Sequence, residues 1–243
     1  MPSSSSILEK NIQVPRASNP GKTLEAFLAQ PSDPGLYPGM LVIHEIMGLN
    51  EDIRQITRRF AEHGYVSLAI DLFSGQNRIM CLLQVFHGLL IRPMKNRVLQ
   101  DLAGTLATLK NLPEVDADHT GVVGFCMGGG YALQLASSGQ QLRSASVFYG
   151  TNPRPLDVVA DACPIVGSYP EDDPITSKAA RQLEAALDLY DVPHDIKVYP
   201  GAQHSFFNQY GSHFDAEANQ DAWQRMLTFF DRYLRDRDHL TQP

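Results

Sequence analysis

From residue 40 onward, short apolar runs alternate with longer amphipathic stretches. This alternation is typical of buried parallel strands joined by crossover helices. The runs predict strands at 40–44, 65–70, 120–125, 145–149, 164–168 and 195–199. We therefore expect an α/β fold with a mostly parallel central sheet flanked by helices.

The beginning of the chain has a different pattern. Two short segments, 7–14 and 23–29, are separated by the turn-like stretch 18–21, which reads Ser-Asn-Pro-Gly. Short strands joined by a turn of this composition predict an antiparallel hairpin. We expect this hairpin at one edge of the sheet.

The amphipathic stretches carry ordinary helix signals. Asn50 precedes two acidic residues and a stripe of Ile53, Ile56 and Phe60, and Gly64 ends the stretch. This is the pattern of an N-cap, an apolar face and a C-terminal glycine. Further helices are expected at 96–111, 127–138, 176–190 and 215–235. The apolar region 72–95 directly follows a strand and is either a helical cap over a site or an ordinary crossover helix.

Composition favours one soluble domain spanning residues 1–243. Apolar residues make up 43% of the chain and charged residues 19%, which suits a large core. A net charge of −7 and an isoelectric point near 5.6 oppose binding to nucleic acid or an anionic membrane. We see no signal peptide in the first ten residues and no apolar window long enough to span a membrane. Three cysteines at unrelated spacings suit the reducing cytoplasm.

The segment Gly-Phe-Cys-Met-Gly at 124–128 follows an apolar strand and precedes a helix-compatible run. It matches the nucleophile elbow G-x-S-x-G with cysteine in place of serine. In that turn Cys126 projects at the carboxyl end of the sheet, and the backbone N–H of Met127 can donate to an oxyanion. We interpret Cys81 and Cys163 as small core residues. The glycines at 128–130 lack the spacing of a phosphate-binding loop.

An elbow nucleophile needs an acid and a histidine after later strands. Asp172 and Asp173 follow the strand expected at 164–168, and spacing alone leaves the choice between them open. His204 lies in a Gly-x-x-His turn after the last strand. The histidine would take the thiol proton and later activate water, while the acid orients its ring.

These motifs together resemble the dienelactone hydrolase family of α/β-hydrolases over residues 7–233. The resemblance selects Asp173 as the acid and adds Glu45, which is similar to the glutamate that engages the resting thiol. It also implies that the N–H of Ile46 is the second oxyanion donor. The matching segments are 44–50, 69–73, 124–129, 148–150, 167–173 and 201–206.

The same resemblance bears on the substrate. It places Phe73, Tyr149, Phe206 and Arg78 among candidate substrate-binding residues. Where family members that act on dienelactone carry two arginines, this chain has Gly75 and Asn208. Loss of those guanidinium groups removes the best partner for a carboxylate, although Arg78 or Arg92 of the expected cap are candidate replacements. We therefore expect an uncharged lactone, an aryl or short-chain ester, or a thioester in place of dienelactone.

The sequence thus predicts a hydrolase that cleaves a small-molecule ester or lactone through a Cys-His-Asp triad and an acyl-thioester. It predicts no cofactor, no metal, and a monomer or homodimer. A broad carboxylesterase or thioesterase is the nearest alternative. A rival of another class is a non-catalytic small-molecule binder or a thiol redox sensor.

Overall fold

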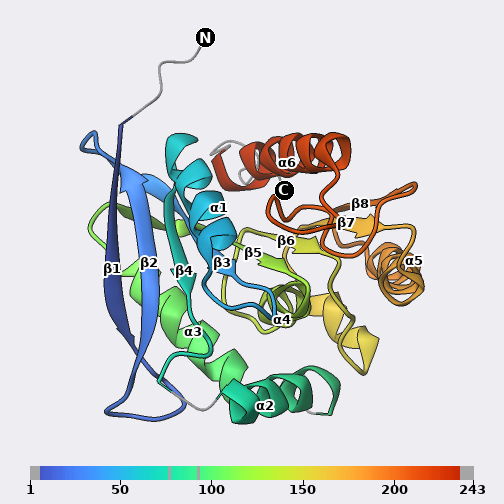
Figure 1. The fold of residues 1–243 in the computed structure, drawn as a ribbon, viewed down its shortest axis with the longest axis horizontal. Coiled ribbons are helices and arrows are strands. Elements are labelled where there is room, and N and C mark those ends of the chain that lie inside the picture. Colours follow the sequence, from blue (N-terminus) through green and yellow to red (C-terminus); the bar gives the residue numbers. More distant parts are fainter. Residues whose placement is uncertain (1–5, 76–77, 92–93, 236–243) are drawn as a thin grey trace.

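A computed structural model describes residues 6–75, 78–91 and 94–235. Every strand within those residues joins one sheet of eight strands, in the order β1-β2-β4-β3-β5-β6-β7-β8. Figure 1 shows this twisted sheet running through the middle of the molecule with helices on both sides. The strands are β1 (Ile7–Pro15), β2 (Thr23–Pro31), β3 (Tyr37–Ile43), β4 (Val66–Ile70), β5 (Val115–Phe125), β6 (Ser144–Phe148), β7 (Ile165–Pro170) and β8 (His194–Tyr199).

The sheet confirms the expected α/β-hydrolase arrangement. β1 and β2 pair antiparallel at one edge, and β2 also pairs antiparallel with β4. From β4 to β8 all neighbours are parallel. The carboxyl ends of the parallel strands therefore all lie at the same end of the sheet, where loops from several strands can converge.

The two faces of the sheet bury different residues, as alternation along a strand requires. In β3, Met40 and Val42 pack in one core cluster, whereas Leu41 and Ile43 pack in another. The helices are α1 (Glu51–Glu62), α2 (Arg78–Leu90), α3 (Arg97–Lys110), α4 (Met127–Ala136), α5 (Pro174–Leu189) and α6 (Ala216–Phe230); a short 3-10 helix, Leu156–Asp161, precedes β7, and a π-helical turn, Asp231–Arg235, follows α6. The first cluster contains residues of α1 and α6, and the second contains residues of α2, α3, α4 and α5.

Helix boundaries follow their capping residues. Asn50 accepts a hydrogen bond from the backbone N–H of Ile53, and Asn96 does the same for Leu99. α5 begins at Pro174, two residues earlier than the sequence predicts, because Asp173 caps it and proline is favoured in the first turn. β5 begins at Val115, five residues earlier than expected, since its polar first residues hid it from a search for apolar runs.

α2 occupies the centre of segment 72–95. Cys81, Val85 and Leu89 form its buried face, and the hydroxyl of Tyr131 in α4 donates to the carbonyl of Val85 at 2.8 Å. The helix lies beside α3 and α4 (Figure 1). Its role as a cap stays a prediction. No helix of the described residues combines the length and apolarity needed to cross a bilayer.

Candidate active site

The turn from β5 into α4 places Cys126 in a left-handed backbone conformation, with φ of 56°. Such strain is rare outside glycine and gathers at functional turns. The flanking glycines relieve the crowding that the turn creates. A Cβ atom on Gly124 would lie 2.0 Å from the carbonyl oxygen of Gly128, and one on Gly128 would lie 2.4 Å from the carbonyl oxygen of Ile43. The elbow therefore requires glycine at both positions.

Three side chains from separate loops form a continuous hydrogen-bonded line. The Nε2 atom of His204 lies 3.1 Å from the Sγ atom of Cys126, and its Nδ1 atom lies 2.6 Å from Oδ2 of Asp173. With the carboxylate accepting from Nδ1–H, Nε2 is free to accept the thiol proton. The three residues follow β5, β7 and β8 and therefore meet at the carboxyl end of the sheet.

Asp173 is itself held from two sides. Its Oδ1 accepts from the backbone N–H groups of Ile175 and Thr176, and its Oδ2 accepts from the Thr176 hydroxyl at 2.7 Å. Burial opposes ionisation, but the hydrogen bonds from Thr176 and His204 outweigh it and hold the pKa of Asp173 below its usual value. The acid is therefore ionised and fixed in orientation. Asp172 is exposed.

The Cys126 thiol, unlike the Asp173 carboxyl, is held in its protonated form. Burial raises the pKa of Cys126 to about 11, the negative charges of Glu45 and, to a smaller extent, Asp173 act in the same direction, and hydrogen bonds from the N–H groups of Met127 and Ile46 oppose the rise. Two backbone donors thus point at the sulfur from the start of α4 and from the loop after β3. The resting Cys126 side chain is therefore a protonated thiol, with its sulfur 3.1 Å from Nε2 of His204.

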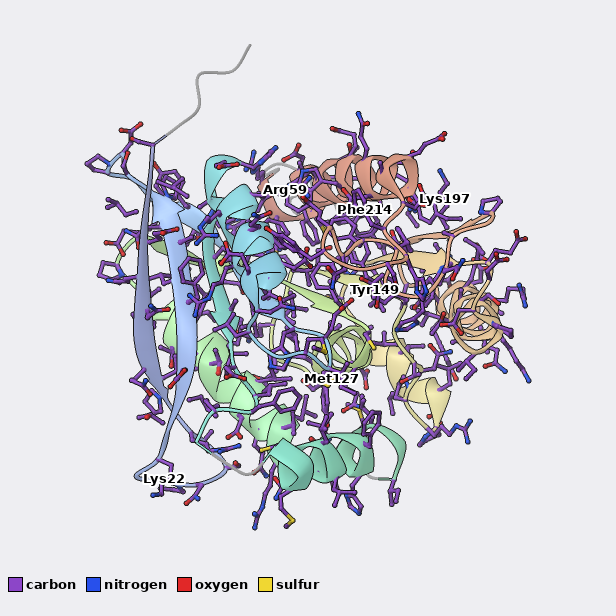
Figure 2. The ribbon with its side chains drawn as sticks, in the orientation of Figure 1. Lys22, Arg59, Met127, Tyr149, Lys197 and Phe214 are labelled. Atoms are coloured by element: carbon purple, nitrogen blue, oxygen red, sulfur yellow. The ribbon has the colours of Figure 1, made fainter. Side chains whose placement is uncertain are left out.

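Glu45 lies in the loop after β3 and is 6% exposed. Its Oε1 accepts from the hydroxyl of Tyr149 at 2.8 Å, and its Oε2 accepts from Nδ2 of Asn208 at 3.3 Å. Tyr149 has φ of 40°, and its ring centroid lies 5.0 Å from that of His204. Tyr149 and Met127 both lie in the middle of the view in Figure 2. Glu45 is therefore held by neutral donors beside the triad.

The other expected pocket residues are placed differently. Phe206 has no exposed surface and packs edge-on against Tyr149, so it supports that ring from behind. Phe73 is 9% exposed, and its ring lies 4.9 Å from that of His44. Arg78 begins α2, but its side chain falls outside the described part of the structure, as does Arg92 entirely.

Sequence reasoning missed two side chains around this site. Asp52 is buried in the first turn of α1 and accepts from the backbone N–H of Gln209 at 3.0 Å. His44 is buried and accepts from the N–H of Leu72 through Nε2, so Nδ1–H donates to the carbonyl of Glu45 at 2.6 Å. The sequence offers no local signal for either contact. Across the described residues, we find no cluster of three His, Cys, Asp or Glu side chains that could hold a metal ion.

Comparison with known proteins identifies the family. The model of the dienelactone hydrolase family matches residues 24–234. The chain belongs to the dienelactone hydrolase family. It is 32% identical to a protein of Saccharolobus solfataricus named "Putative carboxymethylenebutenolidase", over 87% of this chain and 95% of that protein. A Synechocystis protein of the same name is also 32% identical, over 89% and 95% of the two chains.

A solved structure supports the same conclusion. The crystal structure described as "Putative Dienelactone Hydrolase" from Klebsiella pneumoniae superposes with a TM-score of 0.82 at 28% identity. The match covers 94% of this chain and 100% of that one. Membership in the dienelactone hydrolase family supports a hydrolase activity for this chain.

Proposed function

We propose that this dienelactone hydrolase relative cleaves an uncharged ester or lactone through nucleophilic attack by Cys126. The observation that carries the proposal is the hydrogen-bonded line from the Cys126 sulfur through His204 to Asp173. A nucleophile, a base within reach of its proton and an acid that orients the base are the elements of acyl-transfer catalysis.

In the first step His204 removes the thiol proton as the sulfur bonds to the carbonyl carbon. The oxyanion that forms accepts hydrogen bonds from the N–H groups of Ile46 and Met127, each contact being worth about 3 kcal/mol in comparable sites. The imidazolium then gives its proton to the departing alcohol oxygen as the C–O bond breaks. Water, deprotonated by His204, hydrolyses the thioester and restores the thiol.

We assign Glu45 a part in the resting state. Its negative charge helps keep Cys126 protonated while the site is empty, which limits oxidation of the sulfur. When substrate enters, Glu45 provides a second acceptor for the thiol proton. Because a high thiol pKa opposes redox chemistry in the empty site, this environment favours an enzyme over a thiol sensor.

The charge of the site supports an uncharged substrate. The ionised groups that act on Cys126 are Glu45 and Asp173, both acidic. Position 208 is an asparagine that donates to Glu45, and position 75 is a glycine. A substrate carboxylate would meet repulsion and no described guanidinium partner, whereas a neutral lactone, aryl ester, short-chain ester or thioester would not.

A substrate panel tests the proposal. Neutral lactones, aryl esters, acyl thioesters and a carboxylate-bearing lactone are assayed with the wild type and with Cys126→Ala. We expect turnover of neutral substrates by the wild type and a loss of at least about 10³-fold in the variant. Cys163→Ala is the matched control, because that thiol lies outside the triad. Equal turnover by Cys126→Ala would refute the mechanism, and no turnover by fresh wild type would favour binding or sensing.

A further inference from the structure

The first two turns of α1 contact the loop that follows His204. The carboxylate of Asp52 accepts from the backbone N–H of Gln209 at 3.0 Å, and Nε2 of Gln55 donates to the hydroxyl of Tyr210 at 2.5 Å. Both contacts join residues more than 150 positions apart in the sequence. α1 therefore fixes the stretch 209–210 just beyond the catalytic histidine.

This loop also reaches Glu45. Asn208, adjacent to the residue held by Asp52, donates to Oε2 of Glu45 at 3.3 Å. Its own Oδ1 accepts from the N–H of Tyr210 at 3.0 Å, which fixes the amide orientation. Asp52, Asn208 and Glu45 thus form one connected arrangement between α1 and the thiol.

Asp52 is a buried carboxylate with little compensation. It is 4% exposed, and this burial raises its pKa to about 6. The hydrogen bond from the N–H of Gln209 opposes the rise. The negative charge of Glu45 adds to it, and the positive charge of Arg59 opposes it. Among the described ion pairs within 4 Å, none joins Arg59 to Asp52. The Arg59 guanidinium instead lies over the ring of Trp223 at 3.9 Å, between α1 and α6 (Figure 2). A buried charge of this kind costs stability.

The charged and titratable groups that face Asp52 come from three elements. Glu45 acts on it from the loop after β3, Tyr149 from the end of β6, and Arg59 from its own helix. On the side of α1 that faces β1, Arg58 pairs with Glu9 and Glu51 at the surface. Of the charged groups that act on Asp52, the carboxylate of Glu45 has the larger effect on its pKa and Arg59 the smaller.

We propose that Asp52 is a positioning residue for the reaction at Cys126, which holds the loop after His204 and acts on the thiol proton through Glu45. This inference rests on the proposed function. When the S–H bond breaks, the electron pair stays on the sulfur that attacks the carbonyl carbon, and the proton forms an N–H bond at His204 or, by the second route, an O–H bond at Glu45. The group that holds the proton returns it to the departing alcohol oxygen. Asp52 acts on the second route. Because this transfer removes the repulsion between two buried carboxylates, an ionised Asp52 favours it.

Asp52→Asn tests the inference, since asparagine keeps the shape and an oxygen that can accept from Gln209 but removes the charge. We expect kcat/KM at pH 8 to fall about tenfold, with most of the loss in single-turnover acylation and little in KM. The acid limb of the pH profile should become shallower, because one of the groups that must be ionised is gone.

Although Asp52→Asn should lower the activity, it should raise the stability of the folded protein. Because the folded-state pKa of Asp52 lies above its ordinary value, its contribution to stability is present below pH 3.8 and lost as pH rises through about 6. Asp52→Asn should therefore melt about 3 °C higher than the wild type at pH 8, with a smaller difference at pH 5. A residue that only supported the fold would destabilise the protein when replaced.

Two further variants complete the test. In a Glu45→Gln background, Asp52→Asn should lower kcat/KM by less than twofold, because the residue through which it acts is already neutral. The matched control is Asp101→Asn, which removes the charge of another buried aspartate. Asp101 lies on α3, and its Oδ2 is 3.1 Å from Nε of Arg16. That variant should melt lower than the wild type and keep the wild-type pH profile.

The inference is overturned if Asp52→Asn keeps the wild-type pH profile, melts lower at pH 8, or loses as much activity in the Glu45→Gln background. These results are distinct from failure of the proposed function, which would appear as full turnover by Cys126→Ala or none by the wild type. The melting comparison needs no turnover, so it decides on the buried charge in either case.

Discussion

The reactivity of Cys126 provides a direct test of the electrostatics of the site. Its thiol has a pKa of about 11 in place of the ordinary value of about 9, because it is buried and lies near Glu45. At pH 8 a pKa of 11 leaves roughly 0.1% thiolate, compared with roughly 10% for the ordinary thiol. Since the thiolate is the species that reacts, alkylation of the empty site should be about 100-fold slower than that of a free cysteine.

The assay is inactivation by iodoacetamide between pH 6 and pH 10, with peptide mass spectrometry to locate the modified cysteine. We expect the rate at Cys126 to rise about tenfold per pH unit over this whole range. Glu45→Gln should alkylate severalfold faster than the wild type, because it removes the second-largest cause of the high pKa. Cys126→Ser measures the background from Cys81 and Cys163.

One result would refute this reasoning. If the alkylation rate already levelled off near pH 7, the sulfur would be an anion paired with imidazolium in the resting site. The protonated thiol that we infer from the burial of Cys126 and from the nearby charge of Glu45 would then be wrong. An unchanged alkylation rate in Glu45→Gln would show that Glu45 does not contribute to the raised pKa of the thiol, and burial would remain as the cause.

Two further substitutions test the triad and the elbow. Asp173→Asn keeps an oxygen that can cap α5 but can present an amide N–H to Nδ1 of His204 in place of a carboxylate oxygen. Ester turnover should therefore fall about 10³- to 10⁴-fold while the melting temperature changes little. Normal turnover would exclude Asp173 as the orienting acid. Gly128→Ala should destabilise the protein by about 3 kcal/mol in urea unfolding, because its Cβ would meet backbone oxygens at 2.4 and 2.6 Å. Gly139→Ala, at φ of 72° with open space around it, is the control and should cost about 1 kcal/mol.

The fold was largely predictable from the sequence because its signals are local. Buried strands read as apolar runs, and Asn50 and Asn96 lie where their side chains cap the next helix. The elbow is equally local, since Gly124 and Gly128 are needed by a turn of five residues. Local patterns in the chain therefore carried enough information to predict the sheet and the turn that presents Cys126.

The surroundings of Cys126 depend on contacts that no local pattern records. Asp52 looks like an ordinary acidic residue in the first turn of a helix, where negative charge is common. Its carboxylate accepts a hydrogen bond from Gln209, which is 157 positions away in the sequence, and Asn208 donates to Glu45 across 163 positions. Spacing likewise left Asp172 and Asp173 open, because the direction of each side chain depends on how α5 is capped.

Backbone strain and buried acidic groups occur together at the carboxyl end of the sheet. Of the five non-glycine residues with positive φ in the described part of the chain, Cys126, Tyr149 and Ser205 lie after β5, β6 and β8, whereas Gln141 and Asp191 lie before β6 and β8. Positive φ costs of order 1–3 kcal/mol at a residue other than glycine. Glu45 and Asp52 are buried beside them and receive hydrogen bonds from neutral donors. Neither feature helps the chain to fold, and each would be relieved by a small substitution. Their coincidence around Cys126 therefore supports the proposed chemistry at that sulfur over a purely structural role.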